Sequence, residues 1–315
     1  MTSAPPTPLL RIGLLGTGPW AGRTHAPALA AHPEVDFVGV WGRRPEAAAK
    51  IAEAHSTTAY DDVDALFAAC DAVAIALPPD IQAPLAVRAA RAGCHLLLDK
   101  PVATTADGAR QVAEAAEAAG VASVVFFTLR FAAGTAPWIA EQAATDGWFT
   151  ACAHWLGAFF RPGAAGTSGT ADPHAASPWR GEKGALWDVG PHALSVLLPT
   201  LGDVTGLTAV PGPGDTVHLT LRHTSGASST AALSLTAPPE ASGVDIELRG
   251  TAGVHPLPAV WGAGVDSFGT AISALLEAAR TGTPHPCDAR FGLHVTEILA
   301  QADAALNATA KQTTA

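Results

Sequence analysis

The chain has 315 residues, enough for two domains of ordinary size, and 48% of them are hydrophobic while 15% are charged. This balance supplies large cores and excludes intrinsic disorder. A formal net charge of -10 argues against nucleic acid or an anionic membrane as the main partner, and no run of about 20 uncharged apolar residues indicates a membrane span.

The first part of the chain alternates short apolar runs with Ala-rich stretches of helical length, which is typical of βαβ units in a parallel sheet covered on both faces. The predicted strands are 11–15, 36–41, 72–77, 95–99 and 121–127. The predicted helices are 20–31, 45–54, 61–69, 81–92 and 104–119. We therefore expect an α/β fold that begins with a doubly wound Rossmann domain over residues 1–130.

The pattern changes after Phe131. Residues 161–178 are rich in small side chains and predict a long loop, either a lid over the substrate cleft or a surface insertion. Beyond this loop the pattern predicts a helix at 184–201, alternating strands at 204–210, 216–223, 227–236 and 244–249, and helices at 267–280 and 289–305. We expect a second, α+β domain over 131–315, built on a mostly antiparallel sheet, with C-terminal helices that return to the first domain. The active site is expected in the cleft of the two domains.

A glycine-rich turn follows the first predicted strand and opens the first predicted helix. Gly16, Gly18 and Ala21 match the G-x-G-x-x-G/A dinucleotide fingerprint, in which the glycines let the backbone approach the pyrophosphate at the helix N-terminus. An ordinary Gly-rich turn is the alternative reading. We expect the turn to bind a cofactor through five consecutive residues: Gly16, Thr17, Gly18, Pro19 and Trp20.

The end of the second predicted strand distinguishes NAD from NADP. A carboxylate there would bind the ribose diol of NAD, but the chain has Gly42-Arg43-Arg44 and no acid before Glu46. Guanidinium groups form charge-assisted bonds with phosphate oxygens, so Arg43 and Arg44 predict NADP as the cofactor, with NAD as the alternative. The other interpretation is that the arginines stack on the adenine or are solvated.

Scarce residue types narrow the chemistry. The only tyrosine is Tyr60, and Asp64 follows it four residues later, so the Tyr-x-x-x-Lys pair of short-chain reductases is absent. Only four lysines occur, and Lys100 directly follows the apolar strand 95–99. The carboxyl end of a parallel strand is where open α/β sheets bind ligands, so Lys100 is a candidate to bind a substrate oxygen, and a solvated strand-end lysine is the alternative.

A second motif, Trp179 to His192, contains a Gly-rich turn followed by Asp188-Val-Gly-Pro-His192. On one helix, Asp188 and His192 would share a face, and imidazole is suited to proton transfer near neutral pH. An isolated Asp/His pair is more often a surface hydrogen bond. Together with Lys100, the pair is more consistent with a catalytic site.

The strings Asp99-Lys100-Pro101 and Asp188-x-Gly190-x-His192 resemble the two signatures of the Gfo/Idh/MocA oxidoreductase family, with Asp99 in place of the usual Glu. The resemblance covers nearly the whole chain. It implies reversible NAD(P)-dependent oxidation of a secondary alcohol on a sugar, cyclitol or sugar-nucleotide. In that scheme Lys100 polarises the reacting oxygen beside the cofactor, His192 is the general acid/base, and Asp188 orients the substrate or the imidazole.

The same resemblance implies further contacts. Leu77 and Pro78 would lie near the nicotinamide, although Gln82 stands where relatives often have His. Arg130 would bind substrate or clamp the domains, and Ser195 stands where the family usually has Asp. Candidate substrate-binding residues are Arg130, Trp179 and Arg180.

Other readings of the chain remain open. The aromatic residues of the second domain favour a reductase of a C=N or other unsaturated bond in a less polar substrate; a lyase or hydrolase with transient redox chemistry and a non-catalytic dinucleotide sensor are further alternatives. The four cysteines form no ligand cluster, so we expect reduced, mostly buried thiols and no metal site. Residues 1–8 show no export signal. We therefore expect a cytoplasmic protein that forms a homo-oligomer through its second-domain sheet.

Overall fold

A computed structural model describes residues 8–160 and 178–313 and divides the chain into two compact units. The first unit comprises Met1–Val102, Asp107–Phe126 and Ala263–Phe291, and the second comprises Ala103–Ala106, Phe127–Gly262 and Gly292–Ala315. The expected lid or insertion lies outside the described residues, apart from its last residue, Pro178. None of the described helices is both long and apolar enough to cross a bilayer.

The first unit contains a six-stranded sheet in the order β3-β2-β1-β4-β5-β6, with every pair parallel. This confirms the predicted doubly wound sheet. The strand order reverses at β1 and β4, which is the point where open α/β sheets place their ligands. The strands are β1 (Leu10–Leu15), β2 (Val35–Trp41), β3 (Thr58–Tyr60), β4 (Ala72–Ile75), β5 (His95–Asp99) and β6 (Ser123–Phe126).

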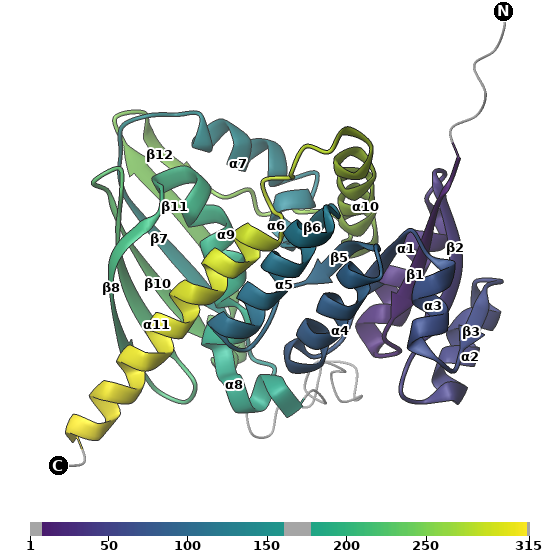
Figure 1. The fold of residues 1–315 in the computed structure, drawn as a ribbon. Helices are drawn as coiled ribbons and strands as arrows, with labels where there is room; N and C mark the ends of the chain where they lie inside the picture. Colours follow the sequence, from purple (N-terminus) through teal and green to yellow (C-terminus); the bar gives the residue numbers. More distant parts are fainter. Residues whose placement is uncertain (1–7, 161–177, 314–315) are drawn as a thin grey trace, which may run out of the picture. The chain divides into compact units, whose positions relative to one another are not determined.

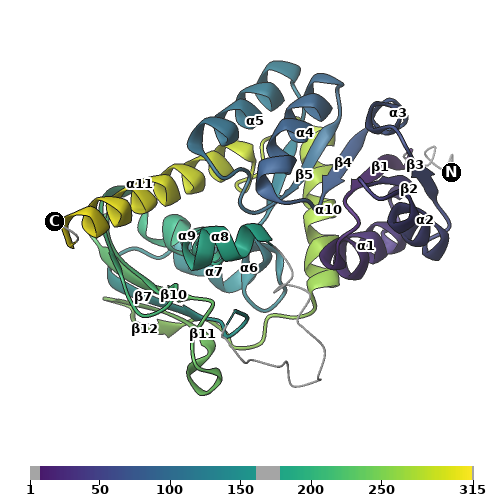
Figure 2. The same ribbon diagram turned by 90° about the horizontal axis from the view of Figure 1, so that it is seen from below.

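Helices cover both faces of this sheet. The helix α10 packs against α1 and the strands β5 and β6, while α4 and α5 lie on the other side (Figures 1 and 2). The alanines from which the helices were predicted are small enough to let the helices pack closely on the strands. Ala86 and Ala109, for example, are 0% exposed. The helices are η1 (Ala21–His25), α1 (Ala26–Ala31), α2 (Pro45–Ala54), α3 (Val63–Ala69), α4 (Pro79–Arg91), α5 (Ala106–Ala119) and α10 (Gly264–Thr281).

The first helix contains a π-helical turn that the sequence pattern does not predict. The N–H of Ala26 donates to the carbonyl of Ala21, five residues back, instead of four. Pro27 follows and has no N–H with which to continue the ordinary ladder. The wider turn directs His25 into the interior, where it is 1% exposed.

The second unit contains a six-stranded sheet in the order β12-β11-β7-β10-β9-β8. Only β10 and β7 pair in parallel, so the sheet is mostly antiparallel, as predicted. The strands are β7 (Trp148–Leu156), β8 (Val204–Pro211), β9 (Val217–His223), β10 (Ser228–Ser234), β11 (Gly243–Gly250) and β12 (Gly253–Pro256).

Helices lie on one face of the second sheet, and the other face is exposed (Figure 2). Strand β9 shows this alternation, since Leu219 and Leu221 are buried while Thr220 and Arg222 are exposed. The helices are α6 (Thr128–Phe131), α7 (Ala136–Ala143), α8 (Pro178–Asp188), α9 (Gly190–Leu201) and α11 (Ala289–Thr313), and a short turn, η2 (Pro239–Ala241), precedes β11.

The single helix predicted over 184–201 is wrong, because the structure has two helices there. Gly184 interrupts α8 with a φ of 67°, and α9 starts afresh after Val189. The physical reason lies in Pro191, which cannot donate a hydrogen bond to the carbonyl four residues before it. Asp188 therefore ends one helix, and His192 lies in the first turn of the next.

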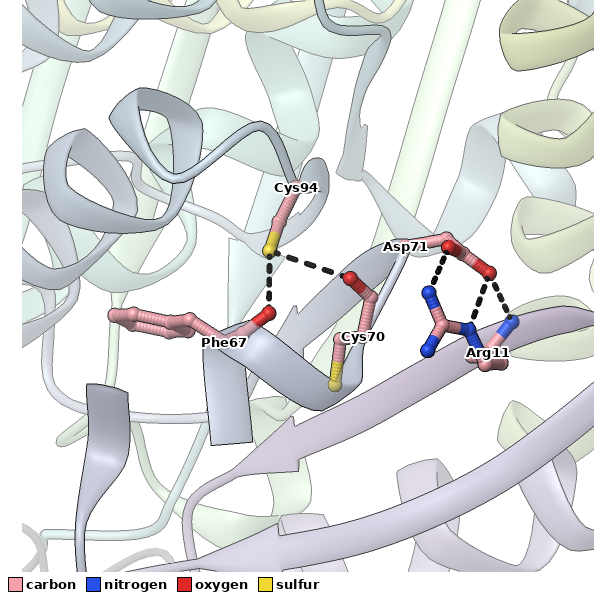
Figure 3. A network of polar contacts seen from close by, with 5 residues as sticks. All are labelled: Arg11, Phe67, Cys70, Asp71 and Cys94. Carbon is pink, nitrogen blue, oxygen red and sulfur yellow. Dashed lines mark hydrogen bonds and ion pairs between the residues drawn. The ribbon is translucent and has the colours of Figure 1, made fainter. Parts of the chain in front are cut away.

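Among the described residues the cysteines form no disulfide, and the expected burial of most of them is confirmed. In the first unit the Sγ of Cys94 donates to the carbonyls of Phe67 at 3.5 Å and Cys70 at 3.9 Å, while Arg11 pairs with Asp71 (Figure 3). Burial raises the pKa of the Cys70 thiol to about 12 and that of Cys94 to about 11, so neither is a nucleophile near neutral pH. The buried cysteines are Cys70, Cys94 and Cys287, and the half-buried one is Cys152.

Candidate active site

The glycine-rich turn lies at the topological switch point of the first sheet. Gly16 has a φ of +127°, and a Cβ there would lie 2.3 Å from the carbonyl oxygen of Ala76 at the end of β4. Its N–H donates to the carbonyl of Trp41 at the end of β2 at 2.9 Å. The turn is thus held by both neighbouring strand ends, and only glycine fits its first position.

The rest of the turn leaves room for a ligand. A Cβ on Gly18 would meet no protein atom within 4 Å. The N–H of Gly22 donates to the carbonyl of Gly18 at 3.0 Å, so the helix begins directly after the turn. A helix N-terminus beside an unobstructed glycine suits an anionic group such as a pyrophosphate, so these residues fit a bound dinucleotide.

The two arginines predicted to select NADP lie next to this turn. A Cβ on Gly42 would lie 2.5 Å from Cγ2 of Thr17, so the end of β2 contacts the fingerprint turn. Arg43 and Arg44 are exposed, and within the described part of the chain neither forms an ion pair or a side-chain hydrogen bond. Both guanidinium groups can therefore bind a phosphate without breaking an existing pair.

Lys100 directly follows β5 at the same edge of the sheet and is half-buried. Leu77 and Pro78, which follow β4, are also half-buried there. The Lys100–Pro101 peptide bond is cis. Because β1, β2, β4 and β5 are parallel neighbours, the first unit gathers all the predicted cofactor-binding residues at the carboxyl edge of its sheet.

The residue before the lysine is fixed from two sides. The Nε2 of His25 lies 3.5 Å from Oδ2 of Asp99, and the amide of Gln82 bonds both the N–H and the carbonyl of Asp99. Burial lowers the pKa of His25, while the Asp99 carboxylate opposes that shift. His25 also packs against the ring of Phe268, with centroids 4.0 Å apart. These contacts link the helix of the cofactor turn to the strand end that carries Lys100.

In the second unit, Asp188 has a cationic partner. Its Oδ1 accepts a hydrogen bond from Nε of Arg180 at 3.1 Å, and both side chains are largely shielded from solvent. The Arg180 guanidinium in turn lies 4.8 Å from the ring centroid of the half-buried Trp179. Asp188 thus holds Arg180 across the two parts of α8, an arrangement that the spacing of Asp188 and His192 did not suggest.

The imidazole of His192 lies flat against an indole. The rings of His192 and Trp155 are 4.7 Å apart at their centroids and inclined by only 13°, and Trp261 packs against Trp155 at 5.7 Å. His192 is 9% exposed. The stacking fixes the plane of the imidazole, so its ring nitrogens can exchange a proton only at the edge of the stack.

Two further contacts support the first turn of α9. Nη1 of Arg130 donates to the carbonyl of Ser195 at 3.2 Å, and the hydroxyl of Ser195 donates to the carbonyl of His192 at 2.7 Å. Arg130 therefore packs α6 against the helix that carries His192. Ser195 is 0% exposed and its hydroxyl bonds the backbone. The residue that stands where the family usually has Asp therefore makes a structural contact here.

The predicted site residues are divided over the two units. The first unit holds Gly16 to Trp20, Arg43, Arg44, Leu77, Pro78 and Lys100, and the second holds Arg130, Trp179, Arg180, Asp188 and His192. Sequence reasoning missed Trp155 and His25 and gave no role to Gln82. Trp155 belongs to β7, a strand that the pattern did not predict. The role of Gln82 could have been suspected, because a polar side chain stands there among apolar helix positions.

Two other features lie apart from these residues. A cavity of about 280 Å³ opens in the first unit beside His95 and Ser123, the first residues of β5 and β6. That is the amino edge of the sheet, opposite Lys100. Among residues 8–160 and 178–313, no group of three His, Cys, Asp or Glu side chains could hold a metal ion.

Comparison with known proteins identifies both halves of the chain. Residues 10–127 match the oxidoreductase family with an NAD-binding Rossmann fold, GFO_IDH_MocA, and residues 157–255 match the GFO/IDH/MocA C-terminal domain. A solved levoglucosan dehydrogenase in complex with NADH and L-sorbose shares the fold, with a TM-score of 0.80 at 20% identity over 95% of this chain and 97% of the other.

Curated relatives are similar over a shorter stretch. A dTDP-3,4-didehydro-2,6-dideoxy-alpha-D-glucose 3-reductase from Streptomyces antibioticus is 35% identical over 39% of this chain. A D-glucoside 3-dehydrogenase from Escherichia coli (strain K12) is 30% identical over 43% of this chain. In each case the alignment spans 38% of the relative's own length.

Proposed function

Because the chain belongs to the Gfo/Idh/MocA family of oxidoreductases, we propose that it interconverts a secondary alcohol and a ketone on a sugar, cyclitol or sugar-nucleotide, using a nicotinamide dinucleotide. One observation carries the proposal. The Gly16 turn is closed by the ends of β2 and β4 at the switch point of the sheet, and Lys100 follows β5 at the same edge. A dinucleotide site and a cationic group for a substrate oxygen therefore share one edge.

In the proposed mechanism the bound cofactor supplies or accepts the hydride at its nicotinamide ring. The ammonium of Lys100 binds the reacting oxygen of the substrate and stabilises negative charge on it. The imidazole of His192 takes the proton from the hydroxyl during oxidation and returns it during reduction. Trp155 holds the plane of that imidazole.

Asp188 has a different task in this proposal from the one that its spacing suggested. Its carboxylate fixes Arg180 at 3.1 Å, and Arg180 has further N–H donors with which to bind substrate hydroxyls. Trp179, half-buried beside Arg180, supplies an apolar surface for the face of a sugar ring. Asp188 is therefore a positioning residue for substrate binding, and the ion pair of Asp188 with Arg180 suits a substrate that carries hydroxyl groups.

We assign NADP as the preferred cofactor. The support is that Arg43 and Arg44 stand next to the fingerprint turn, at the place where an acid would otherwise bind the ribose of NAD. NADH in the related levoglucosan dehydrogenase shows that the fold also takes NAD. The two cofactors are distinguished by direct binding measurements.

The names of the relatives favour carbon 3 of a hexose as the reacting position. One relative is a 3-reductase of a dTDP-linked keto sugar, and another is a 3-dehydrogenase of D-glucosides. We therefore place 3-keto sugars and 3-keto sugar-nucleotides first among the substrates to test.

The expected assembly and location belong to the same proposal. The exposed face of the second sheet carries Arg222 on β9 and Asp245 on β11, on opposite sides of the face. No described helix covers this face, so we propose that it is the surface through which a homo-oligomer forms. We place the protein in the cytoplasm, where NADP-dependent reduction of a sugar would have its cofactor at hand.

A turnover assay tests the proposed function. Purified protein is mixed with NADPH or NADH and a panel of 3-keto sugars, 3-keto sugar-nucleotides and inosose, and the nicotinamide absorbance is followed. The proposal predicts substrate-dependent loss of the reduced cofactor with at least one panel member. Binding of NADPH without turnover of any member would contradict it and favour a dinucleotide sensor.

A further inference from the structure

Gln82 is a fully buried amide in the first turn of α4. Its backbone N–H donates to the carbonyl of Pro78 at 2.8 Å, and its side chain is 0% exposed. Nε2 faces the carbonyl oxygens of Asp99, Pro101 and Val102 at 2.8, 3.1 and 3.2 Å. Oε1 accepts the N–H of Asp99 at 2.9 Å. One side chain thus bonds the backbone on both sides of Lys100.

This arrangement is costly to replace. A buried amide must satisfy its own polar groups, and each carbonyl that it bonds would lose a donor with it. The single Nε2 of Gln82 donates to the carbonyls of Asp99, Pro101 and Val102. The strand-end turn that carries Lys100 therefore depends on Gln82 for its position.

Gln82 also connects two loops of the candidate site. It belongs to the helix that starts directly after Leu77 and Pro78, and it bonds the turn of Lys100. These loops follow β4 and β5, which are adjacent strands. A shift of Gln82 would move the lysine relative to the turn that is expected beside the nicotinamide.

We propose that Gln82 is the positioning residue for Lys100, holding its ammonium at the distance from the cofactor loop that hydride transfer requires. This inference rests on the proposed function. A displacement of a reacting group by about 1 Å costs on the order of 100-fold in rate, so loss of the Gln82 amide should reduce kcat while the fingerprint turn still binds cofactor.

The first variant is Gln82→Met, which keeps the volume of the side chain and removes its hydrogen bonds. The expected results are a 10- to 100-fold lower kcat, an NADPH Kd within about threefold of the wild type, and faster amide exchange in the peptide containing residues 96–103. Gln111→Met on the exposed face of α5 is the matched control, and it should change none of these values.

The second variant is Gln82→Glu, which supplies a readout that general loss of stability would not give. A protonated carboxyl can donate to one carbonyl and accept the N–H of Asp99, whereas an ionised one repels the carbonyls. Burial raises the pKa of a carboxyl, so this variant should regain activity relative to wild type as the pH falls and lose it as the pH rises. Thermal melting at each pH separates this effect from unfolding.

Amide exchange requires no substrate, so it distinguishes failure of this inference from failure of the proposed function. An unchanged kcat in Gln82→Met, or unchanged exchange in residues 96–103, would overturn the positioning role even if the wild type turns over a keto sugar. Equal losses of kcat and of NADPH affinity would also overturn it, because they would show a general structural role. If the wild type turns over no panel member, the proposed function fails. The role of Gln82 is still tested in that case, because slower or unchanged amide exchange of residues 96–103 in Gln82→Met would refute it.

Discussion

Removal of the two arginines after β2 should change the choice of cofactor. Arg43 and Arg44 are exposed and form no ion pair within the described residues, so a 2′-phosphate can be bound without the loss of a competing contact. A charge-assisted hydrogen bond contributes ~1.5–3 kcal/mol, and exposure to solvent favours the lower end. Since about 1.4 kcal/mol is a factor of ten, the arginine that binds the phosphate should account for roughly tenfold in NADPH affinity.

The assay is direct titration of NADPH and NADH into wild type, Arg43→Ala and Arg44→Ala. The phosphate-binding arginine should lose NADPH affinity and leave NADH nearly unchanged, and the preference should shrink as salt rises. Arg91→Ala, at the exposed C-terminal end of α4, is a matched control that should leave both affinities unchanged. Tighter binding of NADH by the wild type, or equal affinity, would refute the assignment of these guanidiniums.

Three further predictions concern Lys100, Trp155 and His25. Lys100→Met should lower kcat by about two powers of ten with NADPH affinity retained; turnover near the wild-type rate would disprove its role. Trp155→Leu should lower kcat up to about tenfold, since an aromatic pair contributes ~0.5–1.5 kcal/mol, while Trp155→Phe should keep most of the activity. Equal kcat values for Trp155→Leu and the wild type would show that stacking on His192 is not needed. Burial lowers the pKa of His25, so as the pH falls the unfolded chain binds the proton before the folded one, and the stability of the fold should fall below about pH 6.5. The melting temperature of His25→Gln should depend less on pH than that of the wild type. An equal decline in both proteins would show that His25 is not the cause.

The first sheet could be predicted closely because its signals are local. A continuous apolar run bounded by a glycine and a charged pair gave β5 (His95–Asp99) with its bounds, and Pro45 with its alanines gave α2. The π-turn before Pro27 escaped prediction, since it depends on which carbonyl the last N–H reaches. Local patterns thus gave five of the six strands and the cofactor turn, but neither the short strand β3 nor the burial of His25.

The second unit was less predictable because its signals are not local. Strand β7 lies in the middle of its sheet, where Trp148, Ala151 and Ala153 are the buried residues and Phe149 is 76% exposed, so no alternation of polarity marks it. Trp155 therefore had no assigned place near His192. The pairing of Asp188 with Arg180 depends on the kink at Gly184, which spacing rules for a regular helix cannot anticipate.

Transfer of a labelled hydride tests the central claim most directly. The wild type is incubated with NADPH carrying two deuterium atoms at C4 of the nicotinamide and a 3-keto sugar from the panel, and the alcohol is analysed by mass spectrometry. The account predicts one deuterium at the new carbinol carbon and one NADP⁺ formed for each alcohol. Product that carries no deuterium and forms without net oxidation of the cofactor would contradict it and indicate a lyase or hydrolase with transient redox chemistry.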